Sequence, residues 1–188
     1  RAMAPVQEEP VGETRRMMSR VSSNLLRNGA VSEFIALAAA EPDDTGDNIS
    51  AKNCFYGELT GLYWLWKNCT DVDVMGVCHY RRFFFKEDGE LMLASDFEKA
   101  LEDCDMLLAD AVESDATNYE GFTSAHRAVY LEQTGEVIKR ICPEYYPSFE
   151  EHLQGHVSHA GNLAVMKKEV FDEYCSWLFS IFFEFKKD

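Results

Sequence analysis

The feature that most constrains the fold is a short apolar segment that ends in a cluster of polar and cationic residues. Residues 74–78 read VMGVC, as a buried strand does, and His79, Tyr80, Arg81 and Arg82 follow directly. Open α/β sheets bind their ligands at the carboxyl ends of their strands, so this pattern predicts a binding site there. Arginine side chains match the oxygens of phosphate and carboxylate groups, which predicts an anionic ligand.

Helical and strand-like segments alternate on both sides of the strand at 74–78. A helix is predicted around residues 55–66, where apolar side chains recur at helical spacing: Phe55, Leu59, Leu62, Tyr63 and Trp66. A capping box at 95–98 predicts a helix through about residue 102. Other predicted elements are helices at 125–141, 148–153 and 169–185, and strands at 105–109, buried, and 163–166. The alternation predicts an α/β domain with a largely parallel sheet.

The chain divides into two segments of different character. Residues 1–42 form a divergent N-terminal segment that we expect to be partly disordered or helical, because prolines and acids concentrate at its start. A run of helix breakers, EPDDTGDN at 41–48, separates it from the rest. Residues 43–188 are therefore predicted to form the α/β domain.

Composition narrows the classes of partner. The formal net charge of −15 over 188 residues argues against nucleic acid and anionic membranes, both of which reward a basic surface. Six cysteines are scattered without a CxxC pair, which is typical of reduced thiols in the cytoplasm. The beginning of the sequence shows no signal-peptide pattern, so we expect a cytoplasmic protein.

The central block closely resembles a bacterial family designated domain of unknown function 4422. Seven strings carry the resemblance: DNIS at 47–50, KN at 52–53, ELT at 58–60, YW at 63–64, WKN at 66–68, Gly76, and HYRRF at 79–83. The closing part is similar too, in NLAVMKKE at 162–169, FDEYC at 171–175 and WLF at 177–179. The resemblance covers about residues 43–188.

This resemblance implies a GT-A-like fold, an open and mostly parallel sheet flanked by helices, incomplete at both termini relative to the family. It implies a glycosyltransferase that moves a sugar from a nucleotide-sugar, most simply a UDP-sugar, to a glycan or lipid-linked acceptor in capsule or exopolysaccharide biosynthesis. Membrane association, if any, would be peripheral and through other proteins. The alternative is a catalytically degenerate GT-A-like module that binds a partner. Two differences from the family pattern favour the degenerate module. Residues 1–42 contain no equivalent of the family's first strand, and residues 110–115 form an acidic loop where the family has a basic one.

The predicted catalytic residues are His79, Arg81 and Arg82. Glycosyltransferases of this fold usually end the corresponding strand with an Asp-x-Asp that holds a divalent metal. Two guanidinium groups can instead neutralise the leaving diphosphate directly, and His79 can add a hydrogen bond or a proton. We therefore expect no required cofactor, with a divalent metal optional. The simpler alternatives are surface salt bridges for the arginines and a buried structural role for the histidine.

Six residues on the preceding segment are predicted to bind the donor: Asp47, Asn48, Lys52, Asn53, Glu58 and Trp64. Lys52 and Asn53 would contact a base or phosphate, and Glu58 would orient an arginine. Trp64 offers a stacking face. The structural alternatives are a helix-capping turn for Asp47 and Asn48, solvation of the first helical turn for Lys52 and Asn53, and core packing for Trp64.

Three further residues, Tyr80, His159 and Asn162, are predicted to contact the substrate. Tyr80 and Asn162 lie in strings that resemble the family, and His159 lies just before one of them. His152, His156 and His159 form a cluster in which the spacing of the first two would suit a metal on one helical face. Gly155 weakens a helix there and no general-base glutamate is placed as in a zinc protease, so we predict no metal site.

Overall fold

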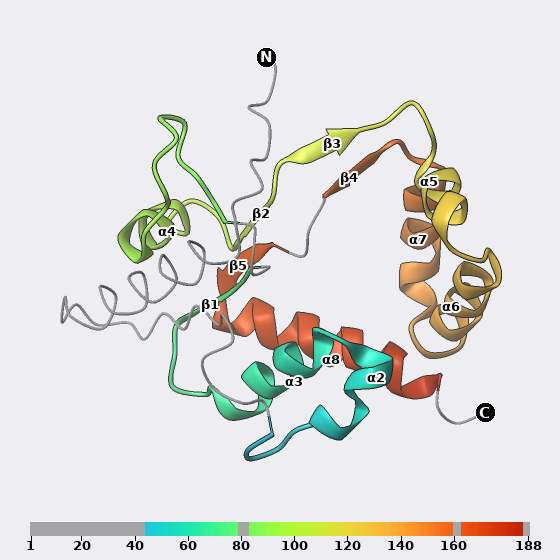
Figure 1. The fold of residues 1–188 in the computed structure, drawn as a ribbon, viewed down its shortest axis with the longest axis horizontal. Coiled ribbons are helices and arrows are strands. Elements are labelled where there is room, and N and C mark those ends of the chain that lie inside the picture. Colours follow the sequence, from blue (N-terminus) through green and yellow to red (C-terminus); the bar gives the residue numbers. More distant parts are fainter. Residues whose placement is uncertain (1–43, 79–82, 160–162, 186–188) are drawn as a thin grey trace. The chain divides into compact units, whose positions relative to one another are not determined.

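The structure is a computed structural model that describes residues 44–78, 83–159 and 163–185 (Figure 1). The chain forms two compact units. Among the described residues, unit 1 comprises those within 44–109 and 163–171, and unit 2 comprises those within 110–159 and 172–185. The chain therefore passes from unit 1 to unit 2 twice, the second time within its last helix. The predicted N-terminal segment, 1–42, lies outside the described residues.

Unit 1 contains a three-stranded sheet with the order β1-β5-β2. Strand β5 (Ala164–Lys167) lies between β1 (Val74–Val77) and β2 (Met106–Leu108), and it pairs antiparallel with both. The prediction of a mostly parallel sheet is therefore wrong for these strands. An apolar run indicates burial but does not encode pairing direction. Strands β1 and β2 do run in the same direction, but the returning β5 separates them.

The strand predicted at 105–109 is present as β2, but the prediction that it is buried is wrong. Met106 and Leu108 are 43% and 42% exposed, while Leu107 between them packs against the core. Such alternation is expected of a strand at the edge of a sheet, with one face covered. The sequence run Met-Leu-Leu contains no polar residue that would have revealed the exposed face.

Helix α4 (Ala94–Ala100) packs on this sheet through Phe97 and Leu101, which form a cluster with Val165. The edge of the Phe84 ring meets Phe97 with 5.4 Å between centroids. The helix begins earlier than the predicted box at 95–98. The Asp96 carboxylate accepts a hydrogen bond of 2.8 Å from the backbone N–H of Leu93, so the acid that closes the first turn is Asp96.

The predicted helix over 55–66 is two helices. A 3₁₀ turn η1 (Ser50–Lys52) leads into α2 (Asn53–Tyr56), and α3 (Leu59–Asn68) follows. Gly57 separates them with φ 53° and ψ −129°, a conformation that essentially only glycine adopts. The predicted apolar stripe is confirmed in α3 for Leu62 and Tyr63, which are buried, whereas Leu59 and Trp66 are half-buried. Leu65, which the stripe did not include, is buried as well. The stripe does not extend to Phe55, which is 78% exposed.

Unit 2 combines helices with a two-stranded ribbon. Its helices are α5 (Asn118–Ala125), α6 (Val129–Ile141), the 3₁₀ turn η2 (Pro143–Tyr145), α7 (Tyr146–Gln154) and most of α8 (Lys168–Glu184). The predictions of helices over 125–141, 148–153 and 169–185 are confirmed in substance by α6, α7 and α8. The core of the unit is built on Val137, Ile138, Cys142 and Ile181.

The acidic stretch at 110–115 is not the predicted loop. Strand β3 (Ala111–Glu113) pairs antiparallel with β4 (Val157–His159), placing Ala111 opposite His159 and Glu113 opposite Val157. The acids made this stretch resemble a solvated loop. A partner strand distant in sequence supplies its backbone hydrogen bonds, and both strands stay exposed, so their charges remain in water.

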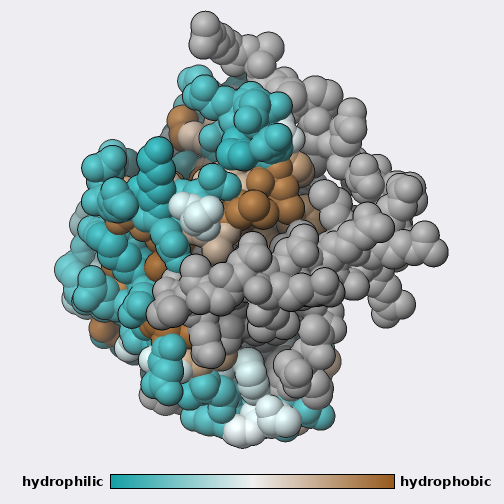
Figure 2. Space-filling model, turned by 90° about the vertical axis from the view of Figure 1, so that its left-hand side faces the viewer, coloured by the Kyte–Doolittle hydropathy of each residue, from teal (hydrophilic) through white to brown (hydrophobic). Residues whose placement is uncertain are grey.

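The surface is mostly hydrophilic on the face shown in Figure 2, with smaller hydrophobic areas among the coloured residues. Among the residues that the structure describes, no helix is long and apolar enough to span a membrane.

Candidate functional site

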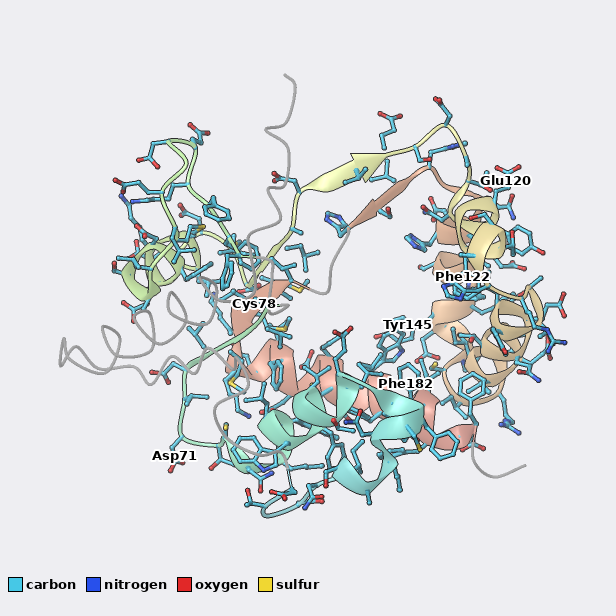
Figure 3. The ribbon with its side chains drawn as sticks, in the orientation of Figure 1. Asp71, Cys78, Glu120, Phe122, Tyr145 and Phe182 are labelled. Carbon is cyan, nitrogen blue, oxygen red and sulfur yellow. The ribbon has the colours of Figure 1, made fainter. Side chains whose placement is uncertain are left out.

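The strand that leads into the predicted catalytic segment is confirmed. Met75 of β1 is 1% exposed, and Cys78, labelled in Figure 3, follows the strand. Burial raises the pKa of the Cys78 thiol. The residues predicted to act there, His79, Tyr80, Arg81 and Arg82, lie outside the described residues, so their roles stay predictions.

The side chain of Asn68 fastens the loop 44–48 to the last turn of α3. Its Oδ1 accepts a hydrogen bond of 3.1 Å from the backbone N–H of Asp47. Its Nδ2 donates to the backbone oxygens of Asp47 and Trp64, both at 2.8 Å. Both amide hydrogens and the amide oxygen are therefore used. We call this arrangement the Asn68 clamp.

Two aromatic side chains of α3 add to the clamp. The Tyr63 hydroxyl donates to Oδ1 of Asp47 at 3.2 Å, and Nε1 of Trp64 donates to the backbone oxygen and Oγ1 of Thr45 at 2.9 and 3.1 Å. Burial is the main cause that raises the pKa of the Tyr63 hydroxyl, and the Asp47 charge and hydrogen bond add to it. The Asp47 carboxylate is thus oriented by protein groups.

Asn48 forms a local polar turn ahead of the first helical turn. Its Oδ1 accepts hydrogen bonds from the backbone N–H and the hydroxyl of Ser50, at 3.3 and 2.9 Å. Its Nδ2 donates to the backbone oxygen of Gly46 at 3.0 Å. This is an Asx turn directly before η1, whose N-cap is Ile49. The turn predicted for Asn48 is therefore present, but its side chain does not occupy the capping position. A ligand contact for this residue stays a prediction.

The remaining predicted donor residues lie along an exposed stretch. Lys52 ends η1, Asn53 begins α2, and Glu58 precedes α3; all three are exposed to solvent. The structure therefore joins Asp47, Asn48 and Trp64 into one hydrogen-bonded network. Lys52, Asn53 and Glu58 come after Asp47 and Asn48 in the chain and lie on the surface.

The clamp and the predicted catalytic segment adjoin opposite ends of β1. Asn68 ends α3, and the short connection 69–73, which contains Asp71, leads from it into the strand. His79 follows the other end, after Cys78; Figure 3 labels Asp71 and Cys78 on either side of β1. The network around Asn68 therefore supports the helix that precedes β1, a structural role that holds whichever ligand binds.

On the acceptor side, only His159 of the predicted residues is described, because Tyr80 and Asn162 are not. It ends β4 in unit 2, exposed and opposite Ala111. His152 lies on α7, whereas Nδ1 of His156 is 3.1 Å from the Ser114 oxygen of the ribbon, so the histidines serve separate elements. Within 44–78, 83–159 and 163–185, no three His, Cys, Asp or Glu residues are grouped as metal ligands.

Sequence reasoning missed three members of the clamp, Thr45, Tyr63 and Asn68, as polar contacts. Trp64 and Asn68 are four residues apart, so their place on one helical face was readable from the sequence. The partner loop, more than fifteen residues away in the chain, was not.

Comparisons with known proteins place the chain in a family. A family model described as Domain of unknown function (DUF4422) matches residues 19–188. No curated protein matches the sequence. Among solved structures, the apo structure of WbbM, a bifunctional glycosyltransferase, is similar with a TM-score of 0.62 and 28% sequence identity. The similarity covers 77% of this chain but 30% of that one, so the chain spans under a third of that protein's length. The fold is thus a mixed α/β fold similar to a glycosyltransferase, and the chain belongs to the DUF4422 family.

Proposed function

We propose that this protein is a glycosyltransferase that transfers a sugar from a nucleotide-sugar donor to a glycan or lipid-linked acceptor in surface polysaccharide biosynthesis. The observation that carries the proposal is the similarity to WbbM, a bifunctional glycosyltransferase, over 77% of this chain. Membership of the DUF4422 family and the expected position of the cationic segment support it.

The proposed donor site is the segment that follows β1. His79, Tyr80, Arg81 and Arg82 follow β1 in the sequence, and the burial of Met75 in that strand supports this choice of site. Departure of a nucleoside diphosphate leaves negative charge on its phosphates, and cationic groups already in place stabilise that charge as it develops. Arg81 and Arg82 would supply the positive charge, without requiring a metal, and His79 a hydrogen bond or a proton.

A second candidate, a binding module without catalysis, is favoured by one observation. Exposed acids, Asp110, Glu113 and Asp115, lie on or beside β3, where the family that the sequence resembles has a basic loop. Acidic side chains repel the phosphates of a donor, the more so at low ionic strength. If the ribbon faces a ligand, that ligand is not the diphosphate.

Nucleotide binding tests the proposal directly. We would measure the melting temperature with UDP, GDP and their sugar conjugates, for the full chain and for Arg81→Ala/Arg82→Ala. A ligand that binds the native state alone stabilises it by about 2.7 kcal/mol at a hundredfold excess over Kd. We expect one nucleotide to raise the melting temperature of the parent and to lose this effect in the double variant.

The adjacent pair Arg15 and Arg16 provides a matched control. Replacing both with alanine removes the same charge from the chain and should leave the nucleotide effect intact. Equal loss in both double variants would indicate a general charge effect. A response to no nucleotide, in a folded sample, would favour the binding module. Transfer that depends on Mn²⁺ and is abolished by EDTA would contradict the expectation that no metal is required.

A further inference from the structure

Three aromatic rings gather on one part of unit 2. The ring of Trp177, on α8, lies 5.4 Å from that of Tyr145, at the end of η2, and 6.4 Å from that of Tyr174, one turn earlier on α8. Both neighbours are tilted against the indole, by 47° and 35°. Figure 3 labels Tyr145, which lies close to α8 in that view. We call these three residues the aromatic surface.

The two tyrosines of the aromatic surface are partly exposed to solvent, and its tryptophan packs against the core of unit 2. Tyr145 is 47% and Tyr174 is 39% exposed. Tyr174 is the less open of the two, and burial raises the pKa of its hydroxyl. Trp177 is half-buried, and its inner side packs on the core cluster that contains Cys142 and Ile181. A ring held by the core keeps its orientation without a ligand, so binding costs little ordering entropy.

The polar atoms of the surface point to a ligand with hydroxyl groups. The Trp177 Nε1–H is buried and has no hydrogen-bond partner among the described residues. Burial raises the pKa of the Cys142 thiol and the nearby Trp177 indole lowers it, but the two groups are not in hydrogen-bonding geometry. Because its N–H is buried, the Trp177 indole can contact a ligand through its ring but not through the N–H. Neither the Tyr145 nor the Tyr174 hydroxyl bonds to another residue that the structure describes, so both can bind a ligand.

Charge restricts the ligand further. Residues 110–159 and 172–185 of unit 2 contain twelve Asp and Glu residues but three Lys and Arg. Two of the three cations are already paired: Lys139 with Glu136 at 2.9 Å and Arg140 with Glu184 at 3.2 Å. An anionic ligand, such as a nucleotide, is disfavoured on this unit. A neutral molecule with an apolar face and a hydroxyl rim fits the rings and the surrounding carboxylates.

We propose that the aromatic surface of Tyr145, Tyr174 and Trp177 binds a neutral saccharide, with a sugar ring stacked on the aromatic faces. The C–H face of a pyranose is apolar, whereas its hydroxyls can bond to the tyrosine hydroxyls and to nearby acids such as Glu144. Tyrosine and tryptophan suit such sites because each combines an apolar body with a polar end. The inference rests on the proposed function in one respect: it assigns the saccharide as the acceptor.

Binding of neutral sugars to the full chain tests this inference without any donor. The probes are methyl glycosides of glucose, galactose and mannose, and cellobiose, observed by saturation-transfer NMR and tryptophan fluorescence. We expect at least one to bind, and Tyr145→Ala to weaken it about two- to tenfold, the range that one aromatic contact gives. Tyr145→Phe keeps the ring and should retain most of the affinity.

Tyr130 offers a matched control in the same unit, because it is an exposed tyrosine, at 51%, on α6. Tyr130→Ala should bind sugar as the parent does. Equal binding by the parent and Tyr145→Ala, or binding of no probe, would overturn the inference. Loss of self-association in Tyr145→Ala, measured by sedimentation, without any sugar binding would also overturn it and indicate a protein interface.

The two proposals can fail separately. Nucleotide binding without sugar binding would leave the proposed donor site standing and refute the aromatic surface. Sugar binding that depends on Tyr145, without nucleotide binding, would support the aromatic surface and refute the glycosyltransferase.

Discussion

At the scale of single residues, Gly46 meets two demands at once. Its φ of 56° lies in the left-handed region, and a Cβ added there would come 2.0 Å from Oδ1 of Asn68. Gly89 has a φ of 86°, but a Cβ added there would meet nothing within 4 Å. Both alanine variants pay for the left-handed backbone, about 1–2 kcal/mol. We expect Gly46→Ala to cost about 1–2 kcal/mol more, because the clamp must open.

A double-mutant cycle in urea unfolding measures this difference. In an Asn68→Ala background the clash is gone, so the cost of Gly46→Ala should fall to that of Gly89→Ala. Hydrogen exchange of peptides over 44–50 should speed up in Gly46→Ala and in Asn68→Ala alike. Equal costs of the two glycine variants in the parent would show that the clamp contributes nothing to stability.

The same residues show how far the sequence reveals a site. A polar turn at Asn48 was predicted from the sequence, because an Asx turn joins residues that are two apart. The clamp was not, because Asn68 and Asp47 are 21 residues apart. Local hydrogen bonds are encoded in spacing. Hydrogen bonds between residues distant in the chain depend on how α3 packs against the loop 44–48, and no short sequence pattern predicts that packing.

At the scale of elements, α5 depends on a complete capping box. The Glu120 N–H donates to Oγ1 of Thr117 at 3.1 Å, and the Thr117 N–H donates to Oε2 of Glu120 at 2.8 Å. We expect Thr117→Ala to destabilise unit 2 by about 1 kcal/mol, the typical cost of losing an N-cap. Thr134 lies inside α6 and donates to the Tyr130 oxygen. Thr134→Ala, the matched control, should be neutral or slightly stabilising, because alanine favours helix interiors.

The capping box should also make the stability of α5 depend on pH. The Glu120 pKa is lowered, first by the Thr117 backbone N–H and then by the Thr117 hydroxyl. A lowered folded-state pKa adds stability that is present above the ordinary value, about 4.3, and is lost as pH falls through the folded value. The stability gap between the parent and Glu120→Gln should therefore be open at neutral pH and close in acid. Circular dichroism in urea at several pH values measures it; a gap that widens in acid would contradict the assignment.

Elements were predicted better than their ends and their partners. Helices α6, α7 and α8 were readable because their apolar periodicity runs over several turns and Pro143 stops α6. The split between α2 and α3 was not read, because a single Gly57 inside a periodic stripe costs a helix only about 1 kcal/mol in general. Its actual backbone conformation is set by the fold. The pairing of β3 with β4 was equally hidden, because short strands owe their hydrogen bonds to a distant partner.

At the scale of the whole molecule, the net charge of −15 opposes the compact state through self-repulsion. Added NaCl between about 0.01 and 0.15 M shortens the screening length from about 30 to about 8 Å. We therefore expect the melting temperature to rise over this range. Thermal unfolding at neutral pH in NaCl and in KCl measures it, and the two salts should act alike if screening is the cause.

Ion pairs act in the opposite direction, because screening weakens attraction too. The salt bridges found among the described residues, such as Lys86–Glu90 and Lys167–Asp105, have at least one well-exposed partner. Exposed pairs contribute about 0–1 kcal/mol each, whereas the unpaired acids repel one another across the whole chain. We therefore expect the relief of repulsion to outweigh the weakening of the ion pairs, so that the melting temperature rises with salt. A melting temperature that falls with salt would mean that the pairs form a stabilising network. If nucleotide is then added at each ionic strength, its effect should weaken as salt rises, because contacts between arginines and a diphosphate are screened while self-repulsion is relieved.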